Sequence, residues 1–286
     1  MGKATNAAKK TNAPAIGSRA ATGEKKAKSE PIISVRNVSI HREASGAILE
    51  NISFDVHDGE FLSIIGPSGC GKTSLLKTIA GLLPLKSGRI LFRGAEIAGP
   101  DKELGLVYQN YALFPWRTAL ENVEFGLEIR GLPRHKRKLM AQEALALFDM
   151  NEHADKYPSE LSGGMQQRVA IARQLVNNPS VILLDEAFSA LDAQTRYKIE
   201  DEIIQIQQGT KKTVVLVTHM VEQALYLSDR AIVIGNGRIK KVILLPERKP
   251  RNKDDQVFRK KVREVENMIK PLSRITTFVK DLETVN

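Results

Sequence analysis

Two short stretches near the start of the chain alternate apolar and polar residues, a pattern that is typical of half-buried strands. Ile33, Ser34 and Val35 begin the first stretch, and residues 49–54 (LENISF) form the second after a turn that contains Gly46. Because the two stretches are separated only by this turn, they predict an antiparallel pair. The chain therefore begins, from about residue 31, with a β-rich segment.

The next part of the chain predicts a parallel α/β core. Residues 61–65 (FLSII) have the length of a buried strand, and a glycine-rich loop and a helical pattern over residues 72–81 follow them. A strand, a loop and a helix in this order are the first half of a parallel βα unit. Residues 181–184, 213–217 and 231–234 are also short and apolar, with helical patterns between them, and predict three further core strands.

Two other regions read as helical. From about residue 109 to residue 177 the strand signals disappear, which predicts a helical part inserted into the α/β core. After Pro246 the chain becomes highly charged, and a helix is expected over about residues 254–269. The apolar residues that recur there near helical spacing are Val257, Phe258, Val262, Val265 and Met268. We therefore expect a charged helical extension over residues 246–286.

Composition narrows the class of protein. The chain has 286 residues, of which 42% are hydrophobic and 27% charged, so it can bury one large core or two smaller ones. No apolar run approaches the roughly 18 residues that a membrane-spanning helix needs. The N-terminus lacks the apolar region of a secretory signal, and the single cysteine, Cys70, excludes an internal disulfide. These features favour the cytoplasm, with any membrane role through partner proteins.

The formal net charge of +10 fits contact with nucleic acid, attraction to an anionic membrane surface, or solubility alone. About half of it lies in residues 1–30, which carry seven basic residues against two glutamates in a stretch without periodicity. We expect this basic tail to be disordered. One interpretation is a wrongly assigned start codon or a solvated arm without function. The other is that the tail attracts the chain to a membrane surface.

A phosphate-binding loop follows the strand at residues 61–65. Residues 66–73 read GPSGCGKT and fit the pattern G-x-x-x-x-G-K-[ST], between a strand and a helix as that motif requires. Glycines let backbone N–H groups face phosphates, Lys72 neutralises the β and γ oxygens, and the Thr73 hydroxyl binds Mg²⁺. A merely tight turn would leave Lys72 and Thr73 unexplained. The positions expected to contact ATP here are Gly66, Pro67, Ser68, Gly69, Cys70, Gly71, Lys72, Thr73 and Ser74.

A second motif places two carboxylates at the end of a strand. Residues 181–186 read VILLDE, so Asp185 lies at the carboxyl edge of the sheet, where a phosphate-bound Mg²⁺ could sit. Glu186, one residue further, is suited to polarise the attacking water. Alone, such a pair is usually an acidic helix start. Together with the phosphate loop, it favours nucleotide hydrolysis.

The third motif narrows the family. Residues 161–168 read LSGGMQQR, in which Ser162 and two glycines open a helix that runs through Ala172 and exposes its N–H groups to an anion. This segment resembles the signature of ABC ATPases. The resemblance implies a head-to-tail dimer with two ATP molecules between the subunits, each facing the signature of the opposite subunit. The signature residues that would contact ATP are Ser162, Gly163, Gly164 and Gln166.

Further matches to that family follow in its usual order. Gln109 resembles the Q-loop glutamine, residues 189–192 (SALD) the D-loop, and His219 the switch histidine. The resemblance covers about residues 32–245 and implies that Gln109 touches Mg²⁺ and a partner, Asp192 links the two ATP sites, and His219 holds the γ-phosphate and positions Glu186.

On this basis we expect an α/β fold: a P-loop NTPase (RecA-like) core with an antiparallel β subdomain and an inserted α-helical subdomain. The ATPase domain would span residues 31–245. The expected catalytic residues are Lys72, Gln109, Glu186 and His219, with ATP and Mg²⁺ as cofactors. The expected Mg²⁺ ligands are Thr73, Gln109 and Asp185.

The chain departs from the family in three places. Residues 33–49 lack the aromatic residue that usually stacks on adenine, so we expect that His41 or Arg42 replaces it, unless His41 is simply an exposed turn residue. Ala187 stands where close relatives often have proline, which affects the rigidity of the turn and not the chemistry. Cys70 begins a helix beside Lys72, an environment that lowers the pKa of a thiol, although a small residue tolerated at a variable position is the simpler interpretation.

The loop after Gln109 suggests a partner. Residues 110–118 read NYALFPWRT, and in ABC transporters a cytoplasmic helix of the permease docks here. Trp116 is our candidate anchor, with packing inside the helical subdomain as the alternative. Residues 113–118, 184–196 and 222–230 look most like importers of the nitrate, sulfonate and taurine type, while polyamine importers share residues 110–115.

The resemblance therefore implies an ATPase subunit on the cytoplasmic face of the membrane that drives import of a small anionic solute. Its partners would be permease subunits, a second copy of this chain in a homodimer and, indirectly, a solute-binding protein, with no nucleic acid. A soluble ATPase acting on nucleic acid or ribosomes is the main competitor, supported only by the basic tail. A module that binds ATP without hydrolysis should have lost Glu186 or His219, and both are present.

Overall fold

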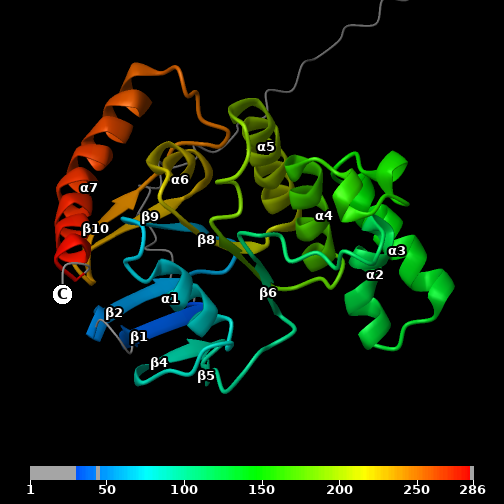
Figure 1. Cartoon of the computed structure of the whole chain (residues 1–286), viewed down its shortest axis with the longest axis horizontal. Coiled ribbons are helices and arrows are strands. Elements are labelled where there is room, and N and C mark those ends of the chain that lie inside the picture. The colour runs from blue at the N-terminus through cyan, green and yellow to red at the C-terminus, as the bar shows by residue number, and fades with distance from the viewer. Residues whose placement is uncertain (1–29, 43–45, 284–286) are drawn as a thin grey trace, which may run out of the picture.

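The computed structural model describes residues 30–42 and 46–283, and side chains from residue 30 to 41 and from 48 to 270. The predicted basic tail therefore lies almost entirely outside the described residues. Figure 1 shows a central sheet, a smaller sheet beside it, a group of helices at one end and a long helix, α7, at the other. The predicted P-loop NTPase fold, with an antiparallel part and inserted helices, is confirmed.

The larger sheet has six strands in the order β10-β9-β3-β8-β7-β6. Its strands are β3 (Phe61–Ile65), β6 (Leu104–Val107), β7 (Val181–Asp185), β8 (Thr213–Thr218), β9 (Arg230–Gly235) and β10 (Arg238–Leu244). Only β10 runs antiparallel to its neighbour. Every residue of β3, β7 and β8 is buried, as expected for parallel strands that are covered on both faces.

The smaller sheet is antiparallel, in the order β2-β1-β4-β5. It contains β1 (Ile33–Arg42), β2 (Gly46–Val56), β4 (Ser87–Phe92) and β5 (Ala95–Glu96). With helix α1 (Lys72–Ile79), its apolar side chains pack against one face of the larger sheet. Arg230 joins the sheets, because its Nη2 donates to the Asp55 carbonyl at 2.5 Å and its Nε lies 2.7 Å from Glu60 Oε1.

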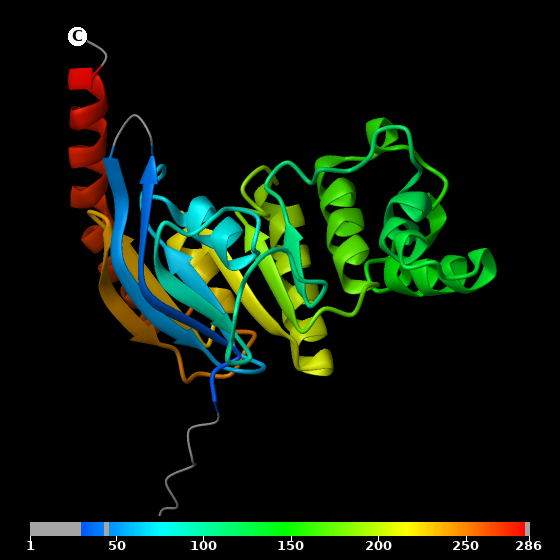
Figure 2. The same cartoon turned by 90° about the horizontal axis from the view of Figure 1, so that it is seen from below.

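Three α-helices lie between β6 and β7: α2 (Ala119–Ile129), α3 (Arg134–Ala146) and α4 (Gly163–Leu175). Two short 3₁₀ turns, Asn151–His153 and Pro158–Glu160, connect α3 to α4. Thr118 starts α2 with a capping box that it forms with Glu121. Figure 2 shows this group projecting from the side of the molecule opposite α7.

The remaining helices are α5 (Ala193–Thr210), α6 (Val221–Leu227) and α7 (Gln256–Glu283). Helix α7 is longer than the predicted 254–269, although Phe258, Val262 and Val265 are buried as the spacing indicated. Val257, which belongs to the same spacing pattern, is 68% exposed. Among the described residues, no helix has both the length and the apolar character needed to cross a membrane.

Candidate functional site

The phosphate loop connects the end of β3 to the start of α1, and two of its glycines are required by their surroundings. Gly71 has φ +94°, in the left-handed region, and a Cβ there would lie 2.9 Å from Leu49 Cγ. A Cβ on Gly66 would lie 2.7 Å from the Ile234 carbonyl oxygen. The backbone of the loop can therefore approach its neighbours, and a ligand, only because these side chains are missing.

Lys72 is held inside the curl of this loop. Lys72 is only 4% exposed, and its Nζ donates to the carbonyl oxygens of Gly66 and Pro67, each at 2.9 Å. The ammonium also lies 3.8 Å from Glu186 Oε1. A positive charge is thus fixed where the loop and the first turn of α1 expose N–H groups, which is an environment for phosphate oxygens.

Thr73 and Asp185 meet across the end of the sheet, as the motifs predict for two ligands of one metal ion. Thr73 Oγ1 donates to Asp185 Oδ1 at 2.7 Å. The pKa of Asp185 is raised, chiefly because the carboxylate is buried. The charge of Glu186 also raises it, while the hydrogen bond from Thr73 acts in the opposite direction. A cation here would relieve the cost of this buried carboxylate, and its two hard oxygen donors fit Mg²⁺.

The Thr73 and Asp185 pair alone offers few ligands to a metal ion. Among the described residues, no group of three or more His, Cys, Asp or Glu side chains could hold a metal ion. Mg²⁺ usually takes one or two protein ligands together with water and substrate phosphates. The Thr73 and Asp185 pair therefore fits an ion that arrives with a nucleotide and fits poorly with a resident metal.

Glu186 and His219 lie on the ends of neighbouring strands. The register of β7 and β8 places Asp185 beside Val217, and the Glu186 N–H donates to the Val217 carbonyl at 2.9 Å. His219 Nδ1 lies 3.2 Å from Glu186 Oε2. The carboxylate thus lies between a lysine and a histidine, where it can orient a water molecule and accept its proton.

The signature residues begin helix α4 as predicted. Ser162 is exposed, and its Oγ accepts the N–H of Met165 at 3.3 Å. Gln166 instead uses its amide internally, donating to the carbonyls of Pro158 and Leu161 at 3.0 and 3.1 Å. Asp192 caps α5 by accepting the Thr195 N–H at 3.0 Å. Within the described chain, none of these side chains hydrogen bonds to the phosphate loop.

Neither Gln109 nor His41 hydrogen bonds to the other residues of the site. Both residues are exposed, Gln109 in the turn after β6 and His41 near the end of β1. In the described part of the chain neither side chain makes a hydrogen bond or ion pair. Their expected contacts with Mg²⁺ and with adenine therefore stay predictions.

Sequence reasoning missed the residues that hold the loop after Gln109. Tyr111 and Ala112 both have left-handed backbones, with φ of 61° and 47°. Arg173 of α4 donates to both of their carbonyl oxygens, at 2.9 and 2.8 Å. Asn122 of α2, which is fully buried, accepts the Phe114 N–H at 2.8 Å. Polar residues inside apolar helical patterns were the available signal.

The lowered pKa that the helix start and Lys72 suggested for Cys70 is not found. Its pKa is raised, because burial of the thiol outweighs the lowering effect of the Lys72 charge. The position at a helix start alone predicted a lowered pKa, because the sequence does not show how far the loop covers the sulfur. Cys70 is therefore a weak nucleophile at neutral pH.

Trp116 is 70% exposed, which disfavours packing inside the helical group. The neighbouring Phe114 does pack there, with its ring 4.5 Å from that of Phe125. The Arg117 guanidinium lies 4.9 Å from the Phe125 ring. A rigid loop thus presents an exposed indole beside an anchored phenyl ring.

Comparisons with known proteins agree with these motifs. The ABC transporter family matches residues 49–189. An uncharacterized ABC transporter ATP-binding protein from Methanocaldococcus jannaschii is 46% identical over 224 residues, which cover 78% of this chain and 84% of that protein. A taurine import ATP-binding protein from Roseobacter denitrificans is 44% identical over 220 residues, covering 75% and 82%.

Other relatives carry different names. A nitrate transport protein from Klebsiella oxytoca is 44% identical over 214 residues, with 73% of this chain and 82% of that protein covered. A spermidine/putrescine import ATP-binding protein from Pasteurella multocida is 42% identical over 219 residues, with 76% and 59% covered.

Solved structures give the same picture. A dimeric bacterial ABC transporter cassette superposes with a TM-score of 0.69 and 34% identity, covering 76% of this chain and all of that one. A dimeric ATP-binding cassette in a post-hydrolysis state with ADP and phosphate superposes with a TM-score of 0.68 and 33% identity over the same shares. The chain therefore belongs to the ABC transporter ATP-binding proteins and is an ATPase.

Proposed function

We propose that this chain hydrolyses ATP to drive import of a small anionic solute, of the nitrate, sulfonate or taurine type, through a separate membrane permease. Its taurine and spermidine/putrescine relatives are both named as import ATP-binding proteins. The anionic cargo is favoured because the taurine and nitrate relatives match over 82% of their length, against 59% for the polyamine relative. A polyamine remains the second candidate.

The observation that carries the proposal is the position of Glu186. Its carboxylate lies 3.8 Å from Lys72 and 3.2 Å from His219, next to the Thr73 and Asp185 pair. Lys72 neutralises phosphate oxygens, Glu186 orients a water and accepts its proton, and His219 holds Glu186 in place. Mg²⁺ bound with ATP would neutralise phosphate charge beside Thr73 and Asp185, and Gln109 is the further ligand that the family resemblance implies.

A second copy of the chain completes this site in the proposal. Ser162 and Gly163 are exposed at the start of α4 and face no phosphate within their own chain. Exposed N–H groups at a helix start bind anions, so they suit the phosphates held by a neighbouring subunit. The dimeric cassettes among the solved structures support this arrangement.

Replacing the general base tests the ATPase mechanism. In Glu186→Gln the amide can still orient water but accepts no proton, so ATP hydrolysis should fall by about a hundredfold or more. ATP should still bind, and the variant should elute as a dimer with ATP and as a monomer without it. Steady-state hydrolysis and size-exclusion chromatography measure the two effects. Normal turnover in this variant would remove Glu186 from the mechanism.

The proposed docking place of the permease is the loop that carries Trp116. A cavity of about 500 Å³ beside it is lined by both charge signs, including Arg117, Glu121, Glu124 and Arg137. Arg137 Nε lies 3.0 Å from Glu124 Oε2, so the floor of this cavity is fixed by an ion pair. An amphipathic permease helix with an apolar residue against Trp116 fits this surface.

Trp116→Ala should weaken binding to the permease, by about 2 kcal/mol or more if Trp116 is the anchor. It should leave basal ATP hydrolysis by the isolated protein unchanged, because the exposed indole contacts Phe114 and lines a cavity that contains neither Lys72 nor Glu186. Co-purification from native membranes measures the first effect, and the same material identifies the permease. Stimulation of the reconstituted complex by taurine or nitrate, and not by spermidine, supports the anionic cargo. Stimulation by spermidine alone contradicts it.

A further inference from the structure

A segment after β10 carries basic residues at alternating positions, and each is largely buried. We call residues 245–253 the basic strap; its largely buried cations are Lys249, Arg251 and Lys253, with side chains 6%, 5% and 20% exposed, while Arg248 is exposed. In Figure 1 the strap leaves β10 and passes toward α6 and α5 before α7 begins. Buried charges are costly unless they are paired, so each cation must have a specific reason to lie there.

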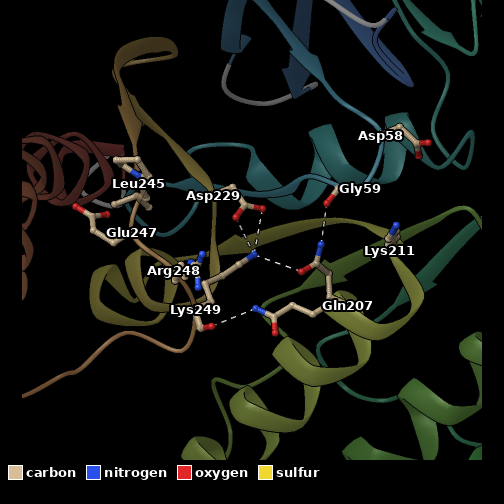
Figure 3. Close-up of a pocket in the computed structure, with 11 residues that line it drawn as sticks. Asp58, Gly59, Gln207, Lys211, Asp229, Leu245, Glu247, Arg248 and Lys249 are labelled. Carbon is tan, nitrogen blue, oxygen red and sulfur yellow. Dashed lines mark hydrogen bonds and ion pairs between the residues drawn. The ribbon is translucent and has the colours of Figure 1, made fainter. Parts of the chain in front are cut away.

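Lys249 fastens the start of the strap to the core. Figure 3 shows its ammonium between Asp229 and Gln207, at the edge of a cavity of about 840 Å³. Nζ lies 2.9 Å from Asp229 Oδ1 and donates to Gln207 Oε1 at 3.3 Å. Gln207 in turn donates to the Gly59 carbonyl at 2.7 Å. The strap is thereby joined to α5 and to the turn before β3.

Arg251 fastens the middle of the strap to the end of α6. Its guanidinium donates to the carbonyl oxygens of Leu225 and Tyr226, each at 2.9 Å, and to that of Leu245 at 2.8 Å. The carbonyls of Leu225 and Tyr226 lie at the C-terminal end of α6, where they lack partners in the helix itself. Arg251 therefore satisfies the last turn of α6 from outside.

Lys253 reaches a buried carboxylate between two helices. Its Nζ lies 2.7 Å from Glu200 Oε2, and 3.6 and 4.0 Å from the ring centroids of Tyr197 and Tyr226. Glu200 is 1% exposed, and its other oxygen accepts from Gln223 Nε2 at 3.0 Å. One carboxylate of α5 thus joins the strap to α6.

This junction lies directly behind the catalytic residues. Helix α6 begins two residues after His219 and contains Gln223 in its first turn. Helix α5 begins immediately after Asp192 and contains Glu200. Arg196 of α5 also donates to the sulfur of Met220 at 3.4 Å. The position of the first turn of α6, and with it His219, therefore depends on contacts made with α5.

We propose that Lys253 is a positioning residue for ATP hydrolysis. It neutralises Glu200, which lets that carboxylate stay buried and hold Gln223, so that α6 presents His219 to Glu186. Without the ammonium, a buried unpaired carboxylate must recruit water or turn away, and either change releases Gln223. The proposal rests on the role given above to His219.

Lys253→Met keeps most of the volume of the side chain and removes its charge. The full-length variant should hydrolyse ATP with a kcat roughly tenfold lower and an unchanged KM, because the phosphate loop is not touched. Lys253→Arg should restore most of the activity, since a guanidinium can pair with Glu200 and stack on both tyrosines. Lys261→Met is the matched control: it breaks the ion pair to Glu247 at 2.9 Å, which joins α7 to the basic strap and leaves the Lys253–Glu200–Gln223 contacts in place.

The double variant Lys253→Met/Glu200→Gln separates positioning from folding. The glutamine keeps an oxygen for Gln223 but carries no buried charge, so kcat should recover toward wild type. This result would hold even if the single variant folds poorly. A double variant as slow as the single one, or an equal loss in Lys261→Met, would overturn the proposal, as would an unchanged kcat in Lys253→Met.

Hydrogen exchange of residues 221–227, measured without ATP, tests whether Lys253 positions α6 independently of the role of His219. In Lys253→Met these amide hydrogens should exchange faster than in the wild type, and in Lys261→Met their exchange should be unchanged. If His219→Ala hydrolyses ATP normally, the assigned role of His219 fails while the exchange result still decides whether Lys253 positions α6. Unchanged exchange in Lys253→Met would overturn the proposal.

Discussion

Glu186 has a backbone conformation that residues with a side chain rarely adopt. Its φ of 45° lies in the left-handed region, which costs on the order of 1 kcal/mol outside glycine. Two contacts hold it there: the N–H donates to the Val217 carbonyl, and its own carbonyl accepts from Ser189 Oγ at 2.9 Å. The strain turns the carboxylate from the end of β7 toward Lys72 and His219.

Cys70 gives a prediction that depends on pH. Because burial raises its pKa above the ordinary value of 9.0, the thiolate fraction at about pH 8 is smaller than for an exposed cysteine. Alkylation by iodoacetamide should therefore be slow at that pH and should accelerate as the pH rises past 9. Once modified, the protein should no longer bind ATP, since the added group fills the phosphate loop.

Mass spectrometry follows this reaction cleanly, since the chain has one cysteine. The same protein unfolded in urea is the control, because there the thiol is exposed. Faster alkylation of the folded protein than of the unfolded protein at about pH 8 would contradict the raised pKa. Full ATP binding after confirmed modification would show that the loop tolerates the bulk.

At the scale of residues, the sequence predicts which side chains form the site better than it predicts what surrounds each side chain. Lys72, Thr73, Asp185, Glu186 and His219 come together in the structure because strand ends bring distant motifs to one edge of the sheet. The sign of the Cys70 pKa shift and the internal role of Gln166 were not predictable, because both depend on what the fold places around the side chain.

At the scale of elements, Gly164 sets how closely α4 approaches α5. A Cβ at this position would lie 2.4 Å from Thr195 Cγ2, closer than any real contact of this kind. Gly163, next to it, is different: its nearest neighbours would be Tyr111 Oη at 3.6 Å and Leu191 Cδ2 at 3.9 Å. The second glycine of the signature therefore has a packing role besides any contact with ATP.

Gly164→Ala should lower the free energy of unfolding by about 1–3 kcal/mol, because α4 or Thr195 must shift to make room. Adding Thr195→Ser removes the obstructing methyl group and should recover most of that loss. Chemical denaturation measures both. Gly163→Ala is the control and should be neutral or stabilising, since it has space and alanine favours the helix. Equal losses in Gly163→Ala and Gly164→Ala would refute this packing argument.

The elements that sequence reasoning missed lack the patterns on which it relies. Strand β4 exposes its first three residues, β6 is four residues long, and β10 has the sequence RIKKVIL with mostly exposed side chains. β6 and β10 are the two edges of the larger sheet, where burial on both faces is lost. By contrast, β3, β7 and β8 are central and were predicted within a residue or so.

At the scale of the molecule, the two faces of the larger sheet belong to different cores. Along β3, Leu62 and Ile64 pack with α1 and the smaller sheet, while Phe61 and Ile65 pack with the helices on the other face. The fold class followed from the order of the motifs. The strand order could not be predicted, since pairings such as β3 with β8 join segments about 150 residues apart, and local sequence carries little information about them.

The basic strap bears on how much of the chain is needed for the folded ATPase. The ATPase motifs finish at His219, yet Arg251, Phe258, Val262 and Val265 are buried in the same core as the helices behind the site. A boundary drawn from motifs at residue 245 would cut through this core, leaving the last carbonyls of α6 bare and Glu200 charged in an apolar interior. We therefore expect the smallest fragment that folds as this ATPase to reach at least to Val265, because these side chains must stay buried.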